Sequence, residues 1–326
     1  MSPRPILAAL LAVAVLLAAP PSSGQASEQA RAVAVTFDDL PYQAPESVLC
    51  DPARATALTE AFVGMLAPLD TRATGFVNEG WVCEAQRAAL LPALLDRWLD
   101  AGLDLGNHTA RHIGLNDLSA EAFLAEVDAG APATRAALAR RGRPLRFFRH
   151  PFLSTGDTPE KRAAVDAGLA ARGYTVAPVT LDNSDWMFAA VYARAEAAGD
   201  AALMRQVGEA YVAYMATVLD HWEPYSATLT GGREPAQVLL LHVNALNRDW
   251  YPQIHALYLA RGYRFVTLDE ALADPLYRLR DDYVRDNGVS WLHRWTVSAG
   301  RPIRWEPEPP AWIVAAHEAR NLPGAP

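Results

Sequence analysis

The feature of this sequence that most constrains its fold is a repeated alternation of short apolar strand signals with longer helical patterns. Such alternation is typical of a parallel sheet flanked by helices, because the chain needs a crossover, usually a helix, to return between parallel strands. The first predicted strand is an alternating apolar run, and the later ones are short apolar segments. The seven predicted strands cover 32–35, 73–77, 103–106, 145–148, 174–181, 238–241 and 264–268.

Polar side chains collect just after these strands, and their distribution distinguishes two parallel-sheet architectures. A (β/α) barrel gathers chemistry at the carboxyl ends of many strands, whereas an open doubly wound sheet gathers it at one switch point. Because several different strands carry such residues and only seven strand signals occur, the sequence predicts a distorted, incomplete TIM-like barrel. The residues concerned are Asp38, Asp39, His108, Arg149, Asp182, Asp185 and His242.

The strand–helix repeats place the barrel over residues 31–273, and two segments do not fit the repeat pattern. A helical insertion covers 187–236 and separates two strands that are followed by polar residues. A C-terminal extension over 274–326 is rich in Trp and Pro. The chain is therefore predicted to be one barrel with an insertion and an extension.

Composition and the first residues bear on location and on the class of partner. Hydrophobic residues make up 51% and charged residues 20% of the chain, as in ordinary soluble proteins, and the net charge of −8 argues against nucleic acid as a partner. Residues 1–26 are typical of a signal peptide, with Arg4 before an apolar stretch too short to span a bilayer. No later segment is apolar enough to span a membrane, so we expect a periplasmic or secreted protein.

The only two cysteines are Cys50 and Cys83. An even pair in an exported protein is typically a disulfide. Two unpaired thiols are the alternative, and neither cysteine lies near the histidines in sequence. We therefore predict a Cys50–Cys83 disulfide and assign these residues no chemistry.

Adjacent carboxylates and a pair of histidines together predict a metal site. Asp38 and Asp39 are costly to hold side by side at a strand end unless something compensates their charge. His108 and His112 are spaced i, i+4, so their rings can face the same way if that stretch is helical. With Asp39 they would make a two-His, one-carboxylate set with open positions for water and substrate. Zinc suits these ligands best, with other divalent metals as alternatives.

Five ordered motifs resemble those of the polysaccharide deacetylases with a NodB homology domain, carbohydrate esterase family 4. The resemblance covers about residues 31–270 and implies a metal-dependent, distorted barrel that removes acetyl groups from glycans. The motifs are Thr36-Phe37-Asp38-Asp39, His108-Thr109-Ala110-Arg111-His112, Arg149-His150-Pro151-Phe152, Asp182-Asn183-Ser184-Asp185-Trp186 and Leu240-Leu241-His242.

The resemblance implies a role for each motif residue. Asp39, His108 and His112 would hold the metal. Asp38 would be the general base that deprotonates the attacking water, and Arg149 would pair with it and keep it ionised.

The resemblance also implies a general acid and a substrate pocket. His242 would protonate the leaving group, with either Asp182 or Asp185 orienting it and favouring its charged form. Phe152 and Trp186 would form the wall of the acetyl or sugar pocket, although either could belong to the core.

Three functions remain in competition on these residues. The leading prediction is removal of N-acetyl groups from glycans of the chitooligosaccharide or peptidoglycan type. The same machinery could instead cleave O-acetyl esters, because both reactions pass through a tetrahedral oxyanion. A non-catalytic glycan-binding protein on the same barrel is the third reading, and a missing metal ligand or base would be its sign.

Overall fold

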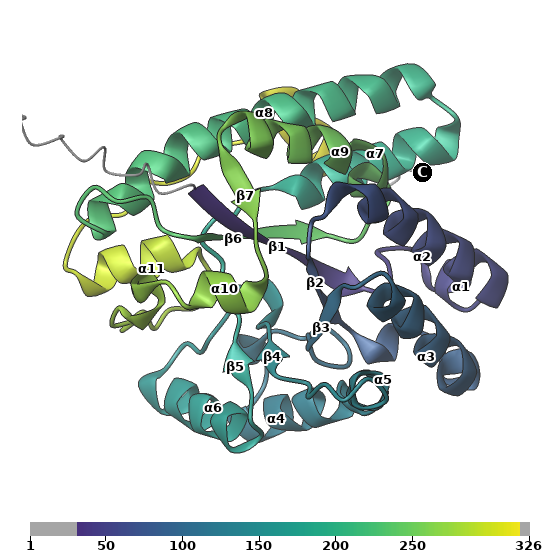
Figure 1. Ribbon diagram of the computed structural model, residues 1–326, viewed down its shortest axis with the longest axis horizontal. Helices are drawn as coiled ribbons and strands as arrows, with labels where there is room; N and C mark the ends of the chain where they lie inside the picture. Colours follow the sequence, from purple (N-terminus) through teal and green to yellow (C-terminus); the bar gives the residue numbers. More distant parts are fainter. Residues whose placement is uncertain (1–30, 320–326) are drawn as a thin grey trace, which may run out of the picture.

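The computed structural model describes residues 31–319, and a parallel sheet occupies its centre (Figure 1). The sheet has seven strands, and every pairing is parallel. Six strands follow the order β5-β4-β3-β2-β1-β6, and the seventh, β7, pairs with β1 outside this order. The strands are β1 (Arg31–Leu40), β2 (Thr74–Val77), β3 (Asp104–Asn107), β4 (Phe147–Phe148), β5 (Thr175–Val176), β6 (Gln237–His242) and β7 (Tyr263–Phe265).

The sheet curls until its two edges approach each other. Beyond β5 the chain leaves β4 and reaches β6, where Leu181 forms a parallel bridge with Leu239. β7 pairs with the first residues of β1, whereas β2 pairs with its last ones. This branching and the single closing bridge confirm the prediction of a distorted, incomplete (β/α) barrel.

One predicted strand is much shorter in the structure than the sequence suggested. The stretch 174–181 was expected to be continuous, but only Thr175–Val176 forms a strand and only Leu181 bridges to β6. Pro178 lies between them, and proline has no N–H to donate to a strand ladder. The interruption lets the segment change partner from β4 to β6.

Helices surround the sheet, with α7, α8 and α9 on one side and α4, α5 and α6 on another in Figure 1. The side chains of Asp51, Ser119 and Thr158 cap α2, α4 and α6. The helices are α1 (Glu46–Leu49), α2 (Pro52–Leu66), α3 (Glu84–Asp100), α4 (Ala120–Ala129), α5 (Pro132–Ala139), α6 (Pro159–Ala171), α7 (Asp185–Ala198), α8 (Ala201–Leu229), α9 (Ala245–Ala260), α10 (Leu268–Leu272), α11 (Trp291–Ser298) and α12 (Ala311–Glu318).

Four helices, α7 and α8 from around the predicted insertion and α11 and α12 from the described part of the predicted C-terminal extension, pack at the outside of the barrel. Within the predicted insertion, α7 ends at Gly199 in the left-handed conformation and α8 follows as the longest helix. In the extension, α11 packs against α8 and α12 against α7. Short 3₁₀ turns, here called η2 (Glu79–Trp81) and η4 (Pro151–Leu153), lie in the loops after β2 and β4.

An aromatic cluster fixes β1 in the barrel. The ring of Phe37 lies 5.1 Å from that of Phe62 on α2 and 5.3 Å from that of Tyr251 on α9, and the ring of Trp98 on α3 stacks on Phe62. Burying a side chain such as Phe37 stabilises the fold by about 1.5–3 kcal/mol. Because Phe37 immediately precedes Asp38 and Asp39, this packing also fixes the position of the two carboxylates.

Two expectations concern the ends of the chain and the membrane. The predicted signal peptide, residues 1–26, lies outside the described residues. Between residues 31 and 319, no helix combines the length and the apolar character needed to cross a membrane.

Candidate metal centre and active site

Asp38 and Asp39 both serve the same site because β1 contains a bulge. Phe37 pairs with Gly75 and Leu40 with Val77, so two residues of β1 lie opposite the single Phe76 of β2. Asp39 adopts a left-handed backbone with φ of 69°. Adjacent residues of a regular strand point to opposite faces, and a bulge breaks that alternation. The bulge is therefore what places two neighbouring carboxylates at one site.

His108 and His112 come from a loop and not from a helix. Thr109 and His112 have positive φ values of 68° and 58°, so the stretch does not form the helical turn on which the i, i+4 spacing was conditional. The backbone of this loop is anchored by Asn78, whose side-chain amide donates to the carbonyl of His108 at 2.6 Å. The two imidazole rings still meet, with centroids 4.8 Å apart.

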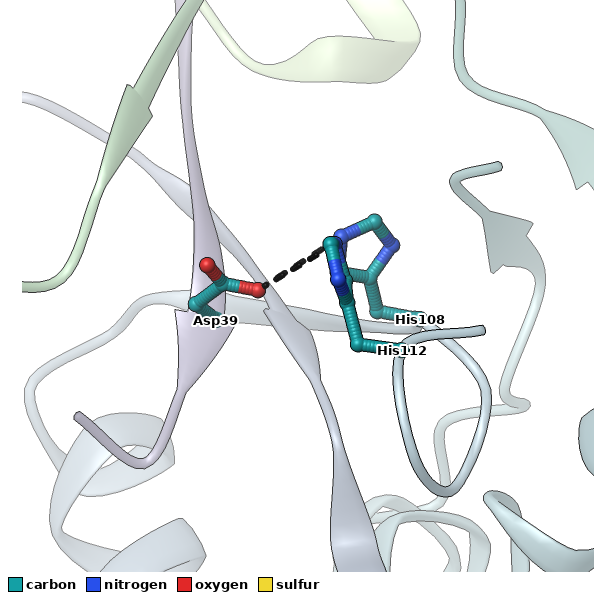
Figure 2. Close-up of side chains that lie close together, drawn as sticks. All are labelled: Asp39, His108 and His112. Atoms are coloured by element: carbon teal, nitrogen blue, oxygen red, sulfur yellow. Dashed lines mark ion pairs between the residues drawn. The ribbon is translucent and has the colours of Figure 1, made fainter. Parts of the chain in front are cut away.

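The three predicted metal ligands converge, as Figure 2 shows. Oδ1 of Asp39 lies 3.7 Å from Nε2 of His108 and 3.6 Å from Nε2 of His112. One ligand atom from each residue falls within 4.8 Å of the other two. This donor set, two imidazole nitrogens and one carboxylate oxygen, is of the kind that holds zinc in hydrolases.

The state of these atoms fits a divalent cation. Oδ1 of Asp39 is buried and finds no hydrogen-bond partner among residues 31–319, while Oδ2 accepts from Gln43 at 2.5 Å. Nδ1 of His108 lies 2.8 Å from the carbonyl of Arg149, which requires Nδ1 to carry the proton and leaves the Nε2 lone pair facing Asp39. Burial lowers the pKa of both His108 and His112, which favours the neutral form that binds metals.

Arg149 pairs with Asp38, as predicted. Its guanidinium is fully buried, and Nη1 lies 3.4 Å from both carboxylate oxygens of Asp38. The remaining donors bind Thr36 Oγ1 at 3.0 Å and the Ala177 carbonyl at 2.8 Å. Burial raises the pKa of Asp38 to about 6 against the opposing charge of Arg149. At neutral pH the carboxylate therefore remains mostly ionised, in the range that suits a general base.

His242 pairs with Asp185, which decides between the two predicted partners. Nδ1 of His242 lies 2.7 Å from Oδ1 of Asp185, and its backbone N–H donates to Oδ2 at 3.0 Å. The side chain of Asp182 instead accepts from the backbone of Asn183, and its carbonyl accepts from the indole of Trp222. Asp182 therefore does not orient the imidazole, although burial raises its pKa to about 7.

The family assignment rests on a comparison of the sequence with family models. The model described as polysaccharide deacetylase matches residues 25–171. This segment belongs to the polysaccharide deacetylase family. It contains Asp38, Asp39, His108, His112 and Arg149, whereas Asp185 and His242 lie beyond it.

The chain is similar to several solved structures, and no curated protein matches the chain significantly. A peptidoglycan deacetylase from Bacillus subtilis is 20% identical, covering 76% of this chain and 93% of its own, with a TM-score of 0.46. A family 4 carbohydrate esterase from Streptomyces lividans in complex with acetate is 20% identical, with coverages of 74% and 95% and a TM-score of 0.44. A family 4 pseudoenzyme from Bacillus anthracis is 15% identical, with coverages of 75% and 66% and a TM-score of 0.49.

The two residues predicted to contact substrate, Phe152 and Trp186, both have exposed side chains. Phe152 is 62% exposed, and its ring centroid lies 4.5 Å from that of His112. Trp186 is 43% exposed and follows Asp185 directly, with its ring against His317 of α12. The sequence left open that either residue belongs to the core. Core side chains are buried, so the exposure of both rings excludes that alternative.

Several residues that support the site were missed in the sequence. Gln43 binds Asp39, Asn78 anchors the histidine loop, and Asn247 on α9 binds the Asp185 carboxylate at 2.9 Å. Trp81 lies beside His112, with ring centroids 6.0 Å apart. Only Gln43 had a local signal, its position four residues after Asp39, because the others reach the site through tertiary contacts.

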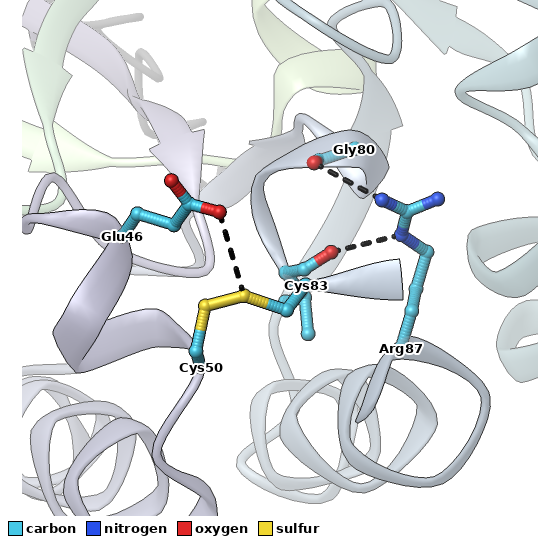
Figure 3. The surroundings of a disulfide bond; sticks show 6 residues. Glu46, Cys50, Gly80, Cys83 and Arg87 are labelled. Carbon is cyan, nitrogen blue, oxygen red and sulfur yellow. Dashed lines mark hydrogen bonds between the residues drawn. A yellow bond between two sulfur atoms is a disulfide. The ribbon is translucent and has the colours of Figure 1, made fainter. Parts of the chain in front are cut away.

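The predicted disulfide between Cys50 and Cys83 is present (Figure 3). Cys50 lies in the connection that leaves β1, and Cys83 follows η2. Arg87 reinforces η2 through bonds to the carbonyls of Val82 and Gly80, and the N–H of Gly80 binds Ala110 in the histidine loop. The bridge therefore joins the segment after Asp39 to the segment that supports the two histidines.

Proposed function

We propose that this protein is a metal-dependent hydrolase that removes acetyl groups from N-acetylated glycans of the chitooligosaccharide or peptidoglycan type. The observation that carries the proposal is the convergence of Asp39, His108 and His112 beside the paired Asp38 and Arg149, within a polysaccharide deacetylase domain. No predicted ligand or base is missing, and such a loss would be the sign of a non-catalytic glycan-binding protein.

Asp39, His108 and His112 would hold the metal, and zinc fits this donor set best. When bound, such an ion supplies a Lewis acid that polarises the acetyl carbonyl and lowers the pKa of water. Two of the ligands are oriented through the atom that does not face the site. Gln43 donates to Oδ2 of Asp39, and the carbonyl of Arg149 accepts from Nδ1 of His108. Such outer contacts fix ligand orientation and protonation.

Asp38 would accept the proton of the attacking water. Its carboxylate lies 3.6 Å from Nε2 of His108, so it borders the metal ligands without being one of the converging set. Arg149 holds the carboxylate in place and favours its ionised form, while burial keeps its pKa high enough to accept a proton.

His242 would donate a proton to the departing amine. Asp185 accepts from Nδ1, which leaves Nε2 as the donor, and the imidazole remains partly accessible with 15% of its side chain exposed. Burial alone lowers the pKa of His242, but the charge and hydrogen bond of Asp185, with the charges of Asp39 and Asp38, raise it to about 10. The imidazolium form needed for proton donation is therefore favoured at neutral pH.

Phe152 and Trp186 would contact the sugar at the rim. Exposed aromatic rings present a flat apolar face with low conformational entropy, which suits the C–H face of a pyranose ring. The predicted signal peptide and the disulfide support export, where acetylated wall or matrix glycans are found.

Acetate release from a glycan panel tests the proposed function. The mature protein loaded with zinc is incubated with N-acetylchitooligosaccharides, peptidoglycan fragments and O-acetylated xylan, with and without a chelator, and zinc is then added back. The proposal predicts release from one or both N-acetylated substrates that is lost with chelator and restored by zinc. Release from xylan alone would assign the protein as an O-acetyl esterase, and no release from any substrate would overturn the proposal.

A further inference from the structure

A chain of buried hydrogen bonds connects helix α8 to the Asp185–His242 pair. The hydroxyl of Tyr211 on α8 donates to Oδ1 of Asn247 at 2.9 Å. The side-chain amide of Asn247 donates to Oδ2 of Asp185 and to the carbonyl of His242, both at 2.9 Å. Oδ1 of Asp185 in turn accepts from the His242 ring. The chain thus runs from the predicted insertion to the proposed general acid.

Every polar atom in this chain has a defined role. Tyr211 is fully buried, and burial raises its pKa well above the ordinary value, so its hydroxyl is neutral. Because Asn247 Oδ1 accepts that hydroxyl, the two N–H groups of the amide must face Asp185 and His242. Asp185 in this way receives one hydrogen bond from Asn247 and two from His242, which leave its carboxylate a single orientation.

We propose that Tyr211 and Asn247 are positioning residues for the general acid, and that this is the contribution of α8 to the reaction. This inference rests on the proposed function of His242. Tyr211 fixes the amide of Asn247, Asn247 fixes the carboxylate of Asp185, and Asp185 holds the imidazole with Nε2 free to donate. Outer partners that orient metal ligands are typically worth about 10- to 100-fold in activity, and we expect these partners of the general acid to fall at or below the lower end of that range.

The titratable groups that face His242 come from four segments. Asp185 lies on α7, Asp38 and Asp39 lie on β1, Asp182 precedes α7, and His108 and His112 lie in the loop after β3. Only Asp185 contacts Asn247, so a change at Tyr211 or Asn247 acts on His242 through Asp185 and not through the β1 carboxylates.

The test uses the zinc-loaded mature protein and two substituted forms, Tyr211→Phe and Asn247→Leu. Tyr263→Phe is the matched control, because Tyr263 on β7 is also buried and its hydroxyl makes one hydrogen bond, to Glu234 at 3.1 Å, outside this chain of bonds. We expect kcat on an N-acetylchitooligosaccharide to fall about 10-fold in Asn247→Leu and about 3-fold or more in Tyr211→Phe. With an activated aryl acetate, whose leaving group needs no proton, both variants should lose less than about 2-fold.

Coupling to Asp185 separates positioning from general damage. In an Asp185→Asn background, Tyr211→Phe should cost nothing further, because its route to His242 is already broken. Equal losses on the amide and the aryl acetate, or losses that add to those of Asp185→Asn, would overturn the proposal.

A direct reading of His242 keeps this test separate from the proposed function. The pKa of its imidazole, followed by nuclear magnetic resonance in the zinc-loaded protein, should fall in Asn247→Leu and stay unchanged in Tyr263→Phe. If the wild-type protein releases no acetate, the proposed function fails while this measurement still decides whether Asn247 acts on His242. An unchanged His242 pKa in Asn247→Leu would contradict the positioning role.

Discussion

Asp38 and His242 lie directly opposite each other on β1 and β6, as partners in the register of two neighbouring parallel strands. Partners in such a register project their side chains to the same face of the sheet. The proposed base and the proposed acid are therefore placed together by backbone pairing alone, and Asp39 joins them because of the bulge that follows Asp38.

The metal assignment predicts that His108→Ala loses its ion. His108 is almost fully buried and presents Nε2 to Asp39, so no neighbouring donor replaces it. His255→Gln is the control, since His255 stacks on Phe265 away from the site. Elemental analysis should find close to one zinc per chain in the wild type and the control and much less in His108→Ala. Undiminished zinc in His108→Ala would place the metal elsewhere.

The disulfide predicts a measurable loss of stability when it is removed. Cys50 and Cys83 are separated by 33 positions in sequence, and closing a loop of this size stabilises a fold by about 3–4 kcal/mol on the chain-entropy account. In urea unfolding, the Cys50→Ser/Cys83→Ser protein should show a free energy of unfolding that is lower by about this amount, and therefore a lower midpoint. Mass spectrometry of the unreduced wild type should show a loss of two hydrogens, and two free thiols would end the assignment.

The Asp185–His242 pair predicts a specific change in the pH–rate profile. His242 acts in its charged form, so activity is lost as pH rises through its pKa in the folded protein. A cation held by Asp39 offsets the contribution of that carboxylate, which leaves Asp185 as the main group that keeps the pKa of His242 raised. Asp185→Asn should move the alkaline limb to lower pH, while Asp182→Asn should move it less. A larger shift in Asp182→Asn would reverse the assignment of the partner.

The aromatic rim predicts a change in substrate affinity rather than in chemistry. Trp186→Ala should raise KM for a chitooligosaccharide several-fold and leave turnover of a small aryl acetate nearly unchanged, because only the longer substrate reaches the ring. Trp312→Ala is the control, a partly exposed tryptophan that lies on α12. Equal effects of both substitutions on KM would show that Trp186 has no special contact with the glycan.

Much of the fold and most of the site residues followed from the sequence, because they are recorded in local patterns. Strand and helix signals placed all seven strands, and the residues after them include the three side chains that converge at the candidate metal site. The bulge at Asp39 and the left-handed backbone of Thr109 and His112 could not be predicted, since non-glycine residues give no local signal for positive φ. The choice of Asp185 over Asp182 was also a matter of tertiary packing.

The contribution of α8 was equally hidden. Tyr211 lies 36 positions before Asn247, in a segment whose helical pattern says nothing about its partner. Sequence periodicity shows which face of a helix is buried. It does not show that the hydroxyl of Tyr211 meets the amide of Asn247, because that contact depends on how the two helices pack. The stretch 174–181 was expected to be one continuous strand, although Pro178 is a local signal for the interruption at which the segment changes partner.

The proposed mechanism depends on Asp38, which would activate water at a site whose metal is held by other residues. The most direct measurement is acetate released from an N-acetylchitooligosaccharide by wild-type and Asp38→Asn proteins, with zinc quantified in the same samples. We predict equal zinc in both and a rate at least ~10²-fold lower in Asp38→Asn, the usual scale for removing a general base. Near-normal acetate release by Asp38→Asn at full zinc occupancy would contradict the account.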